Sequence, residues 1–217
     1  MKYKAVIFDL DGTLADTALD IKFYMNMILK RHSFPEVNQD NINSLIGGGM
    51  RSCMETALAG AEKNEEKIDL YAQELIEEYF NNPVINTCIY EGVDVLLEKT
   101  KQKKMKIAVF SNKDHTITEK IVHKIFGKEM FGFVRGAVEG FPKKPDPAGA
   151  LLVAEKLGVI PKETLYLGDS DTDAITANSG GFKFIAALWG YRTKEEIAAA
   201  GGDIFISKPL ELLDFLE

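Results

Sequence analysis

The sequence predicts an α/β protein with a doubly wound parallel sheet and an inserted all-helical domain. Short apolar runs without polar alternation recur along the 217 residues, as is typical of strands buried on both faces. Helical patterns of about 10–12 residues lie between them, and this alternation is typical of βαβ units. One long segment near the N-terminus has helical periodicity alone, which predicts the insert.

Each expected strand is an uninterrupted apolar run, and each expected helix follows one after a polar loop. The strands are expected at Ala5–Phe8, 106–110, 164–167, 182–187 and 203–206. The helices between and after them are expected at 93–103, 116–126, 147–157, 171–179 and 193–200. Gly158 and the pair Gly180 and Gly181 stand where glycine ends a helix.

The segment from about residue 18 to residue 82 contains no strand-like run. Apolar residues at Ile21, Met25, Ile28 and Leu29 share one face of a helix, and residues 70–80 form a second amphipathic pattern. We therefore expect a helical cap domain at residues 17–86. A Rossmann-like core is expected from residues 1–16 and 87–217.

Composition excludes some classes of partner. The formal net charge is -7, so nucleic acid and anionic membranes would be repelled over most of the surface. Cys53 and Cys88 have no metal-binding or redox spacing, and free thiols predict the cytoplasm. The N-terminal apolar run is too short for a signal peptide or a membrane span.

Polar clusters follow the expected strands at four places in the chain. The clusters are Asp9 with Asp11, Ser111 with Asn112, Lys144, and Asp169 with Asp173. In an open parallel sheet the carboxyl ends of the strands line one crevice, where ligands bind. We therefore expect these side chains to meet in space.

Clustered carboxylates raise one another's pKa, and a hard divalent cation such as Mg²⁺ relieves this repulsion. Lys144 adds positive charge, Ser111 adds a hydroxyl donor, and the turn at Gly12 and Thr13 offers backbone N–H groups. These parts suit phosphoryl transfer, in which one carboxylate attacks phosphorus and a second, two residues on, carries protons. A small phosphorylated metabolite is the expected substrate.

Four motifs resemble those of the haloacid dehalogenase-like phosphatases, and they occur in that family's order. The first is Phe8-Asp9-Leu10-Asp11-Gly12-Thr13-Leu14, and the second is Phe110-Ser111-Asn112. The third is Lys144-Pro145-Asp146-Pro147, and the fourth is Gly168-Asp169-Ser170-Asp171-Thr172-Asp173. They span nearly the whole chain, and the first motif is highly specific.

The resemblance implies a role for each matched residue. Asp9 is the expected nucleophile, Asp11 the acid and base, and Ser111 and Lys144 the phosphoryl clamps, while Lys143 is left in solvent. Gly12, Thr13 and Asn112 are expected to bind substrate. The expected ligands of Mg²⁺ are the Asp9 carboxylate, the Asp11 carbonyl and Asp169, with Asp173 bound directly or through water.

The helical insert resembles the cap of the phosphoglycolate phosphatase-like subfamily, which makes 2-phosphoglycolate the first-choice substrate. Within it, residues 45–51 resemble the substrate-specificity loop, and Arg51 is expected either to bind a substrate carboxylate or to lie in solvent. Trp189-Gly190-Tyr191-Arg192-Thr193 fits the same subfamily and its relatives. Pyrophosphate, nucleotides and sugar phosphates therefore stay open as substrates, and the oligomeric state is undetermined.

Three other classes fit the sequence less well. A haloacid dehalogenase lacks the second acid of the first motif, which is Asp11 here. A β-phosphoglucomutase-like mutase typically has Val at the position of Thr13 and a His-containing cap motif that this chain lacks. A phospho-accepting receiver module carries its acceptor after a middle strand and has no cap, and it does not turn over.

Overall fold

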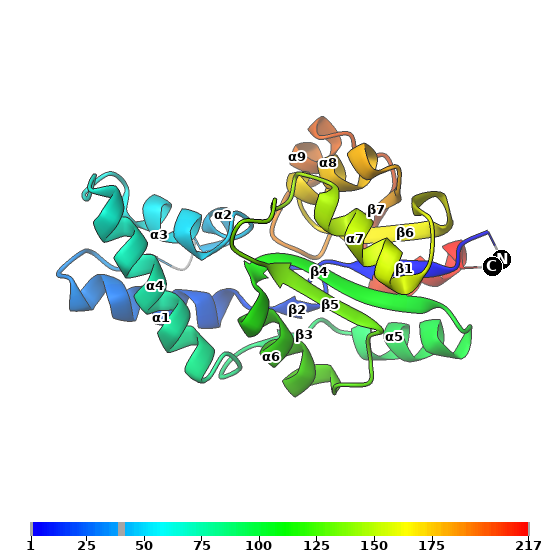
Figure 1. Cartoon of the computed structure of the whole chain (residues 1–217), viewed down its shortest axis with the longest axis horizontal. Coiled ribbons are helices and arrows are strands. Elements are labelled where there is room, and N and C mark those ends of the chain that lie inside the picture. The colour runs from blue at the N-terminus through cyan, green and yellow to red at the C-terminus, as the bar shows by residue number, and fades with distance from the viewer. Residues whose placement is uncertain (1, 39–41, 217) are drawn as a thin grey trace.

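The computed structural model describes residues 2–38 and 42–216, and Figure 1 shows a sheet with a group of helices beside it. The sheet has six strands. The strand order is β5-β4-β1-β6-β7-β8, and every neighbouring pair is parallel. The strands are β1 Ala5–Phe8, β4 Lys106–Asp114, β5 Phe133–Ala137, β6 Thr164–Gly168, β7 Lys183–Ala187 and β8 Phe205–Ile206. This architecture confirms the predicted doubly wound parallel sheet.

Helices cover both faces of the sheet, and β1 shows why its residues are apolar throughout. Val6 and Phe8 pack in one core cluster, whereas Ala5 and Ile7 pack in another on the opposite face. The first face is covered by α5 Val93–Gln102 and α6 His115–Phe126. The second is covered by α7 Ala148–Leu157, α8 Asp171–Gly180 and α9 Lys194–Ala199. Two 3₁₀ helices, η2 Pro161–Glu163 and η3 Pro209–Phe215, complete the core.

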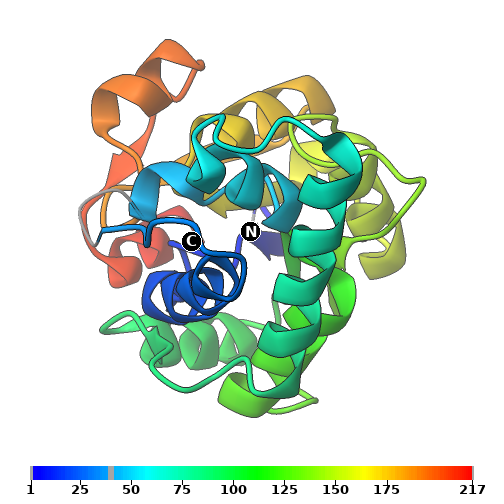
Figure 2. The same cartoon turned by 90° about the vertical axis from the view of Figure 1, so that its left-hand side faces the viewer.

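In the described part of the segment between β2 and β3, four α-helices stand apart from the sheet (Figure 1). They are α1 Ala18–Arg31, α2 Ile42–Leu45, α3 Met50–Leu58 and α4 Glu65–Asn81. Figure 2 views the molecule from their side. Their buried residues belong to the same apolar cluster as α5 and α6. This arrangement supports our proposal that residues 17–86 form a cap on the core formed by residues 1–16 and 87–217.

The structure adds three strands that the sequence did not predict. One is β5, which lies at the edge of the sheet and includes Arg135 and Gly136, so it has no continuous apolar run. The others are β2 Ala15–Asp16 and β3 Cys88–Ile89, an antiparallel pair where the chain leaves and re-enters the core. Strand β4 also runs beyond residue 110, through Ser111 and Asn112 to Asp114. Gly158 and Gly181 end α7 and α8 in the left-handed conformation, as expected.

Within the described residues, no helix has the length and apolar character needed to cross a membrane.

Asp20 joins the two segments that connect the cap to the core. Its fully buried carboxylate accepts hydrogen bonds from the backbone N–H groups of Ile85, Asn86 and Thr87, and from the Thr87 hydroxyl at 2.7 Å. Burial on its own raises the pKa of Asp20, but these hydrogen bonds outweigh burial and the net pKa is lowered. The ionised carboxylate therefore fixes the start of α1 against residues 85–87.

We expect Asp20→Asn to lower the free energy of unfolding by about 2 kcal/mol, because an amide group then faces N–H donors. The melting temperature should fall by about 4–8 °C. The pKa of Asp20 is lowered in the folded state. The difference in free energy of unfolding between wild type and Asp20→Asn should therefore be present above pH 4 and should vanish as the pH falls further. Glu98→Gln, at an exposed position of α5, is the control for thermal melts at pH 7. Equal melting temperatures for Asp20→Asn and wild type would contradict this role.

Candidate active site

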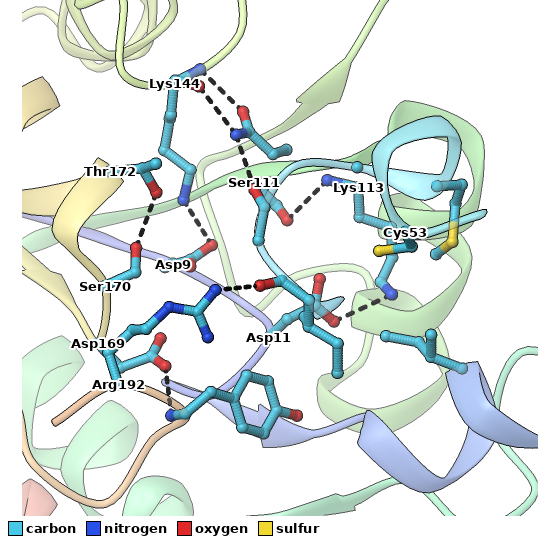
Figure 3. A pocket seen from close by; sticks show the side chains of 17 residues that line it. Asp9, Asp11, Cys53, Ser111, Lys113, Lys144, Asp169, Ser170, Thr172 and Arg192 are labelled. Atoms are coloured by element: carbon cyan, nitrogen blue, oxygen red, sulfur yellow. Dashed lines mark hydrogen bonds and ion pairs between the residues drawn. The ribbon is translucent and has the colours of Figure 1, made fainter. Parts of the chain in front are cut away.

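The predicted site residues come together at the carboxyl ends of the strands, beneath the cap (Figure 3). Asp9 follows β1, Ser111 and Asn112 lie in β4, and Asp169 follows β6. They line a cavity of about 30 Å³, and its cap side consists of Ile46, Gly47, Gly49, Met50 and Cys53 with Ile21. A space of this size holds about two water molecules. Among the described residues of the cap, no charged side chain lines the cavity, and the charged groups that line it belong to the core.

Lys144 lies between two carboxylates that the fold buries with it. Its Nζ is 2.9 Å from Asp9 Oδ1 and 2.7 Å from Asp173 Oδ1, and only 2% of its side chain is exposed. Burial on its own lowers the pKa of Lys144, but the charges of Asp173 and Asp9 outweigh burial and raise the pKa well above its ordinary value. Lys144 is therefore a permanent cation in the wall of the cavity. Lys143 is exposed, as predicted.

Asp9, Asp169 and Asp173 form a cluster in which carboxylate oxygens lie within 4.8 Å of one another. Burial raises the pKa of Asp9, and the charge of Asp173 raises it further, against the opposing effect of Lys144. Burial and the charge of Asp173 likewise raise the pKa of Asp169 to about 7. The cluster thus has too little positive charge for its carboxylates, and oxygen ligands of this kind suit a hard divalent cation.

Both carboxylate oxygens of Asp173 already have hydrogen-bond donors. Its Oδ1 accepts from Lys144 and from the Tyr166 hydroxyl at 3.1 Å, and its Oδ2 accepts from the Ser170 hydroxyl and N–H. Ser170 and Asp173 also form the capping box at the start of α8. Asp9 and Asp169 are therefore the better placed to give an oxygen to a metal.

Asp169 is held in a tight space by the loop that follows Asp11. Its Oδ1 accepts from the Thr13 hydroxyl at 2.8 Å, and its Oδ2 accepts from the Tyr191 N–H at 2.8 Å. A Cβ at residue 12 would overlap this carboxylate, and Gly12 also has a φ of +84°, so only glycine fits there. Gly12 and Thr13, predicted to bind substrate, thus contact Asp169 behind the cavity wall. The Trp189 indole N–H in turn donates to the Thr13 carbonyl at 3.0 Å.

Asp11 lies beside Asp9 and is held through one carboxylate oxygen. That oxygen, Oδ1, accepts from the Thr17 hydroxyl at 2.5 Å and lies 3.0 Å from Lys113 Nζ. The Tyr191 hydroxyl accepts from the Thr17 N–H and so steadies this turn. The orientation of Asp11 therefore depends on residues from three parts of the chain.

Ser111 and Asn112 contribute in different ways. The Ser111 hydroxyl lines the cavity and accepts from the Lys113 N–H at 3.1 Å, which leaves its own proton available for donation. The Asn112 side chain bridges to the backbone of Lys144 at both N–H and carbonyl, and it donates to the Gly47 carbonyl of the cap. Asn112 therefore fixes Lys144 and the cap loop in place.

Arg51 is the predicted site residue that lies away from the cavity. Its guanidinium is half-exposed and forms ion pairs with Glu55, Glu65 and Asp69. Arg51 lines a separate cleft, which Asn112 and Lys143 of the core also line. The arginine that lines the cavity is Arg192 from the core, which donates to the carbonyls of Asn43 and Ile46, at 2.6 Å each. Of the two positions expected for Arg51, these three ion pairs favour the one away from the substrate.

Two cations of the cavity wall, Lys113 and Arg192, were not identified from the sequence. Lys113 follows Asn112 directly, but a lysine at the end of a strand most often extends into solvent. Arg192 was quoted within a C-terminal motif, without a role. Tertiary contacts with residues far away in the chain place both of them.

Comparison with known proteins agrees with this geometry. The family model for haloacid dehalogenase-like hydrolases matches residues 6–187. Phosphoglycolate phosphatase of Aquifex aeolicus (strain VF5) is 33% identical over 215 residues, covering 99% of this chain and 97% of that protein. N-acetylmuramic acid 6-phosphate phosphatase of Pseudomonas aeruginosa is 29% identical over 100% of this chain and 96% of that protein.

A solved structure shows the same fold. The crystal structure of a predicted phosphoglycolate phosphatase from Haemophilus somnus 129pt superposes with a TM-score of 0.90 at 25% identity, covering 100% of this chain and 99% of that one. These matches extend over the core and the helical insert alike. The chain therefore belongs to the haloacid dehalogenase-like hydrolase family, and within it the chain is a phosphatase.

Proposed function

We propose that this phosphatase hydrolyses a small phosphomonoester with the help of Mg²⁺, through a phosphate ester on Asp9, and that 2-phosphoglycolate is its first-choice substrate. The observation that carries the proposal is the position of the Asp9 carboxylate. It lines the cavity 2.9 Å from the Lys144 ammonium, with Asp11 and Ser111 lining the same cavity. A nucleophile, a proton carrier and donors for the phosphoryl oxygens thus share one small space.

Asp9 is oriented for attack through its other oxygen. Oδ1 accepts from the Leu10 N–H at 2.7 Å and from Lys144, so Oδ2 is the oxygen left for phosphorus. Attack forms the bond from Oδ2 to phosphorus while the bond from phosphorus to the ester oxygen breaks. Lys144 and the Ser111 hydroxyl offer donors to the phosphoryl oxygens as charge develops on them.

Asp11 is the proposed proton carrier for both halves of the reaction. It gives a proton to the departing ester oxygen, and it then takes one from the water that attacks the phosphorylated Asp9. Asp11 is two residues from Asp9 and lines the same cavity, so both positions lie on one wall. The closed cap limits the cavity to about two waters, which protects the phosphorylated Asp9 from uncontrolled hydrolysis.

Mg²⁺ is the proposed metal, held by Asp9, Asp169 and the Asp11 carbonyl, with Asp173 acting directly or through water. When bound, it would neutralise the carboxylates and withdraw charge from the phosphoryl group. The raised pKa values of Asp9 and Asp169 support this assignment, because a cation would keep both groups ionised at neutral pH. The free thiols Cys53 and Cys88 agree with a cytoplasmic location, which we also propose.

The substrate proposal rests on the relatives and on the charges of the cavity. The two relatives described above are named for phosphoglycolate and for N-acetylmuramic acid 6-phosphate. Both compounds are phosphomonoesters that also carry a carboxylate. Lys113 and Lys144 each lie within 3.0 Å of an acid, whereas Arg192 lies 3.9 Å from its acidic neighbour, Asp171. Arg192 is therefore the cation proposed to bind the substrate carboxylate. The cavity of about 30 Å³ is too small for either compound, so the cap must move to admit one.

Asp9→Asn should abolish phosphate release while the circular dichroism spectrum stays that of wild type, because an amide cannot attack phosphorus at a useful rate. Asp11→Asn should lower kcat by about 10²–10⁴-fold, since both proton transfers lose their carrier. Release of inorganic phosphate from 2-phosphoglycolate, pyrophosphate, nucleotides and sugar phosphates is the measurement. Near wild-type turnover by Asp9→Asn would contradict the role of Asp9 as nucleophile. Unchanged kinetics of Asp11→Asn would contradict the role of Asp11 as proton carrier.

Mg²⁺ should raise the melting temperature more at pH 8 than at pH 6. The pKa of Asp169 in the metal-free fold is about 7, above its ordinary value of 3.8, so its contribution to stability is present below pH 4 and is lost as the pH rises through 7. Mg²⁺ binds the ionised form, and at 100 times its Kd it adds about 2.7 kcal/mol. The rise at pH 8 should be about 5–10 °C. Asp169→Asn should lose this rise, and equal rises at both pH values would contradict the assignment.

Arg192→Met should raise KM for 2-phosphoglycolate by roughly tenfold to 100-fold, as expected for a lost charged hydrogen bond of about 1.5–3 kcal/mol. KM for ethyl phosphate, which has no carboxylate, should stay near the wild-type value. Arg51→Met is the matched control and should change neither KM, because Arg51 is paired with acids of the cap and does not line this cavity. Equal effects of Arg192→Met on both substrates would show that Arg192 only anchors the cap loop.

A further inference from the structure

Lys113 is a buried lysine in the cavity wall that the proposed reaction does not use. Only 1% of its side chain is exposed, and it lies in β4 directly after Asn112. An ammonium group in such a place is costly unless it is paired and hydrogen-bonded. We therefore expect partners that stabilise the charge of this ammonium group.

The partners of Lys113 come from both the core and the cap. Its Nζ lies 3.0 Å from Asp11 Oδ1, as the dashed line in Figure 3 shows. The same Nζ donates to the Tyr79 hydroxyl at 3.3 Å and lies 4.7 Å from the centre of the Tyr79 ring. Tyr79 belongs to α4 of the cap and is fully buried, with its ring 5.3 Å from that of Tyr24 in α1. Lys113 thus connects α4 of the cap to Asp11.

The contact with Asp11 determines how this carboxyl group is oriented. Thr17 and Lys113 both bind Oδ1, so the plane of the group is set from two sides. The other oxygen is then the one available to carry a proton. Lys113 can donate to Oδ1 whether or not that proton is present, because Oδ1 keeps lone pairs in both forms.

We propose that Lys113 is a positioning residue that orients Asp11 for proton transfer to the leaving group, and that Tyr79 makes this orientation depend on the closed position of the cap. With the cap open, Lys113 loses its hydroxyl acceptor and the face of the ring, and water takes their place. Closing the cap returns the ammonium to the enclosed position in which it holds Asp11. The inference rests on the acid role proposed for Asp11.

A change of leaving group separates positioning of the acid from general damage to the site. An alkyl oxygen needs a proton as it leaves, whereas p-nitrophenolate leaves without one. The ratio kcat/KM reports the steps up to departure of this group, so later hydrolysis of the phosphorylated Asp9 does not affect it. The assay therefore compares kcat/KM for 2-phosphoglycolate, or the alkyl phosphate that the substrate panel selects, with that for p-nitrophenyl phosphate at fixed Mg²⁺.

Lys113→Met keeps the volume of the side chain and removes the ammonium. We expect kcat/KM for the alkyl phosphate to fall by about 100-fold, the lower range for loss of general acid catalysis, while the value for p-nitrophenyl phosphate falls far less. Tyr79→Phe keeps the ring and removes one hydrogen bond, so the alkyl phosphate alone should lose about fivefold. If circular dichroism shows that Lys113→Met does not fold, kcat/KM for the two substrates is compared in Tyr79→Phe instead.

Lys120→Met is the matched control, because Lys120 in α6 also contacts an aromatic ring of α4, that of Phe80 at 4.1 Å, but lies away from Asp11. It should leave both kcat/KM values unchanged. Equal losses on both substrates in Lys113→Met and Tyr79→Phe would overturn the positioning role. Asp11→Asn run in parallel separates the two proposals: if it too fails to discriminate between the substrates, the acid role of Asp11 is what has failed.

Discussion

Repulsion among Asp9, Asp169 and Asp173 is the constraint on which the rest of the site depends. The parallel sheet brings the ends of β1 and β6 together, and the fold then buries three carboxylates within reach of one another. Lys144 offsets part of this charge. Of the three acids, Asp9 and Asp173 form ion pairs with its ammonium group. The remaining deficit of positive charge raises the pKa values of Asp9 and Asp169. This repulsion lowers local stability, and it supports the proposal that the site binds a cation and a phosphoryl group.

The cap is held on the core by the same residues that shape the cavity. Asn112 and Arg192 donate to backbone carbonyls of the cap loop, and Lys113 contacts Tyr79 of α4. Gly49 allows this close approach, because it has a φ of +88° and a Cβ there would lie 3.1 Å from the Asn112 carbonyl oxygen. In the proposed reaction, one set of core side chains would therefore serve both substrate binding and closure of the cap.

The sequence was sufficient to predict the sheet and the acids at its edge. Buried parallel strands have continuous apolar runs, and residues that follow them must meet at one edge, so Asp9, Ser111 and Asp169 could be placed together. Strand β5 was missed because an edge strand tolerates Arg135 and Gly136. Whether an arginine faces the cavity depends on contacts across the cap boundary, which no local pattern encodes. The sequence therefore left the position of Arg51 open between the substrate and solvent.

The single tryptophan of the chain lies close to this charged centre. The Trp189 indole donates to the Thr13 carbonyl, and the Thr13 hydroxyl donates to Asp169, so a single residue separates the indole from a candidate metal ligand. Trp189 also packs against the main apolar cluster. Any event that moves Asp169 changes the surroundings of the only indole chromophore. The protein thus carries a built-in optical probe of its own site, whose ultraviolet emission can be followed without an attached dye.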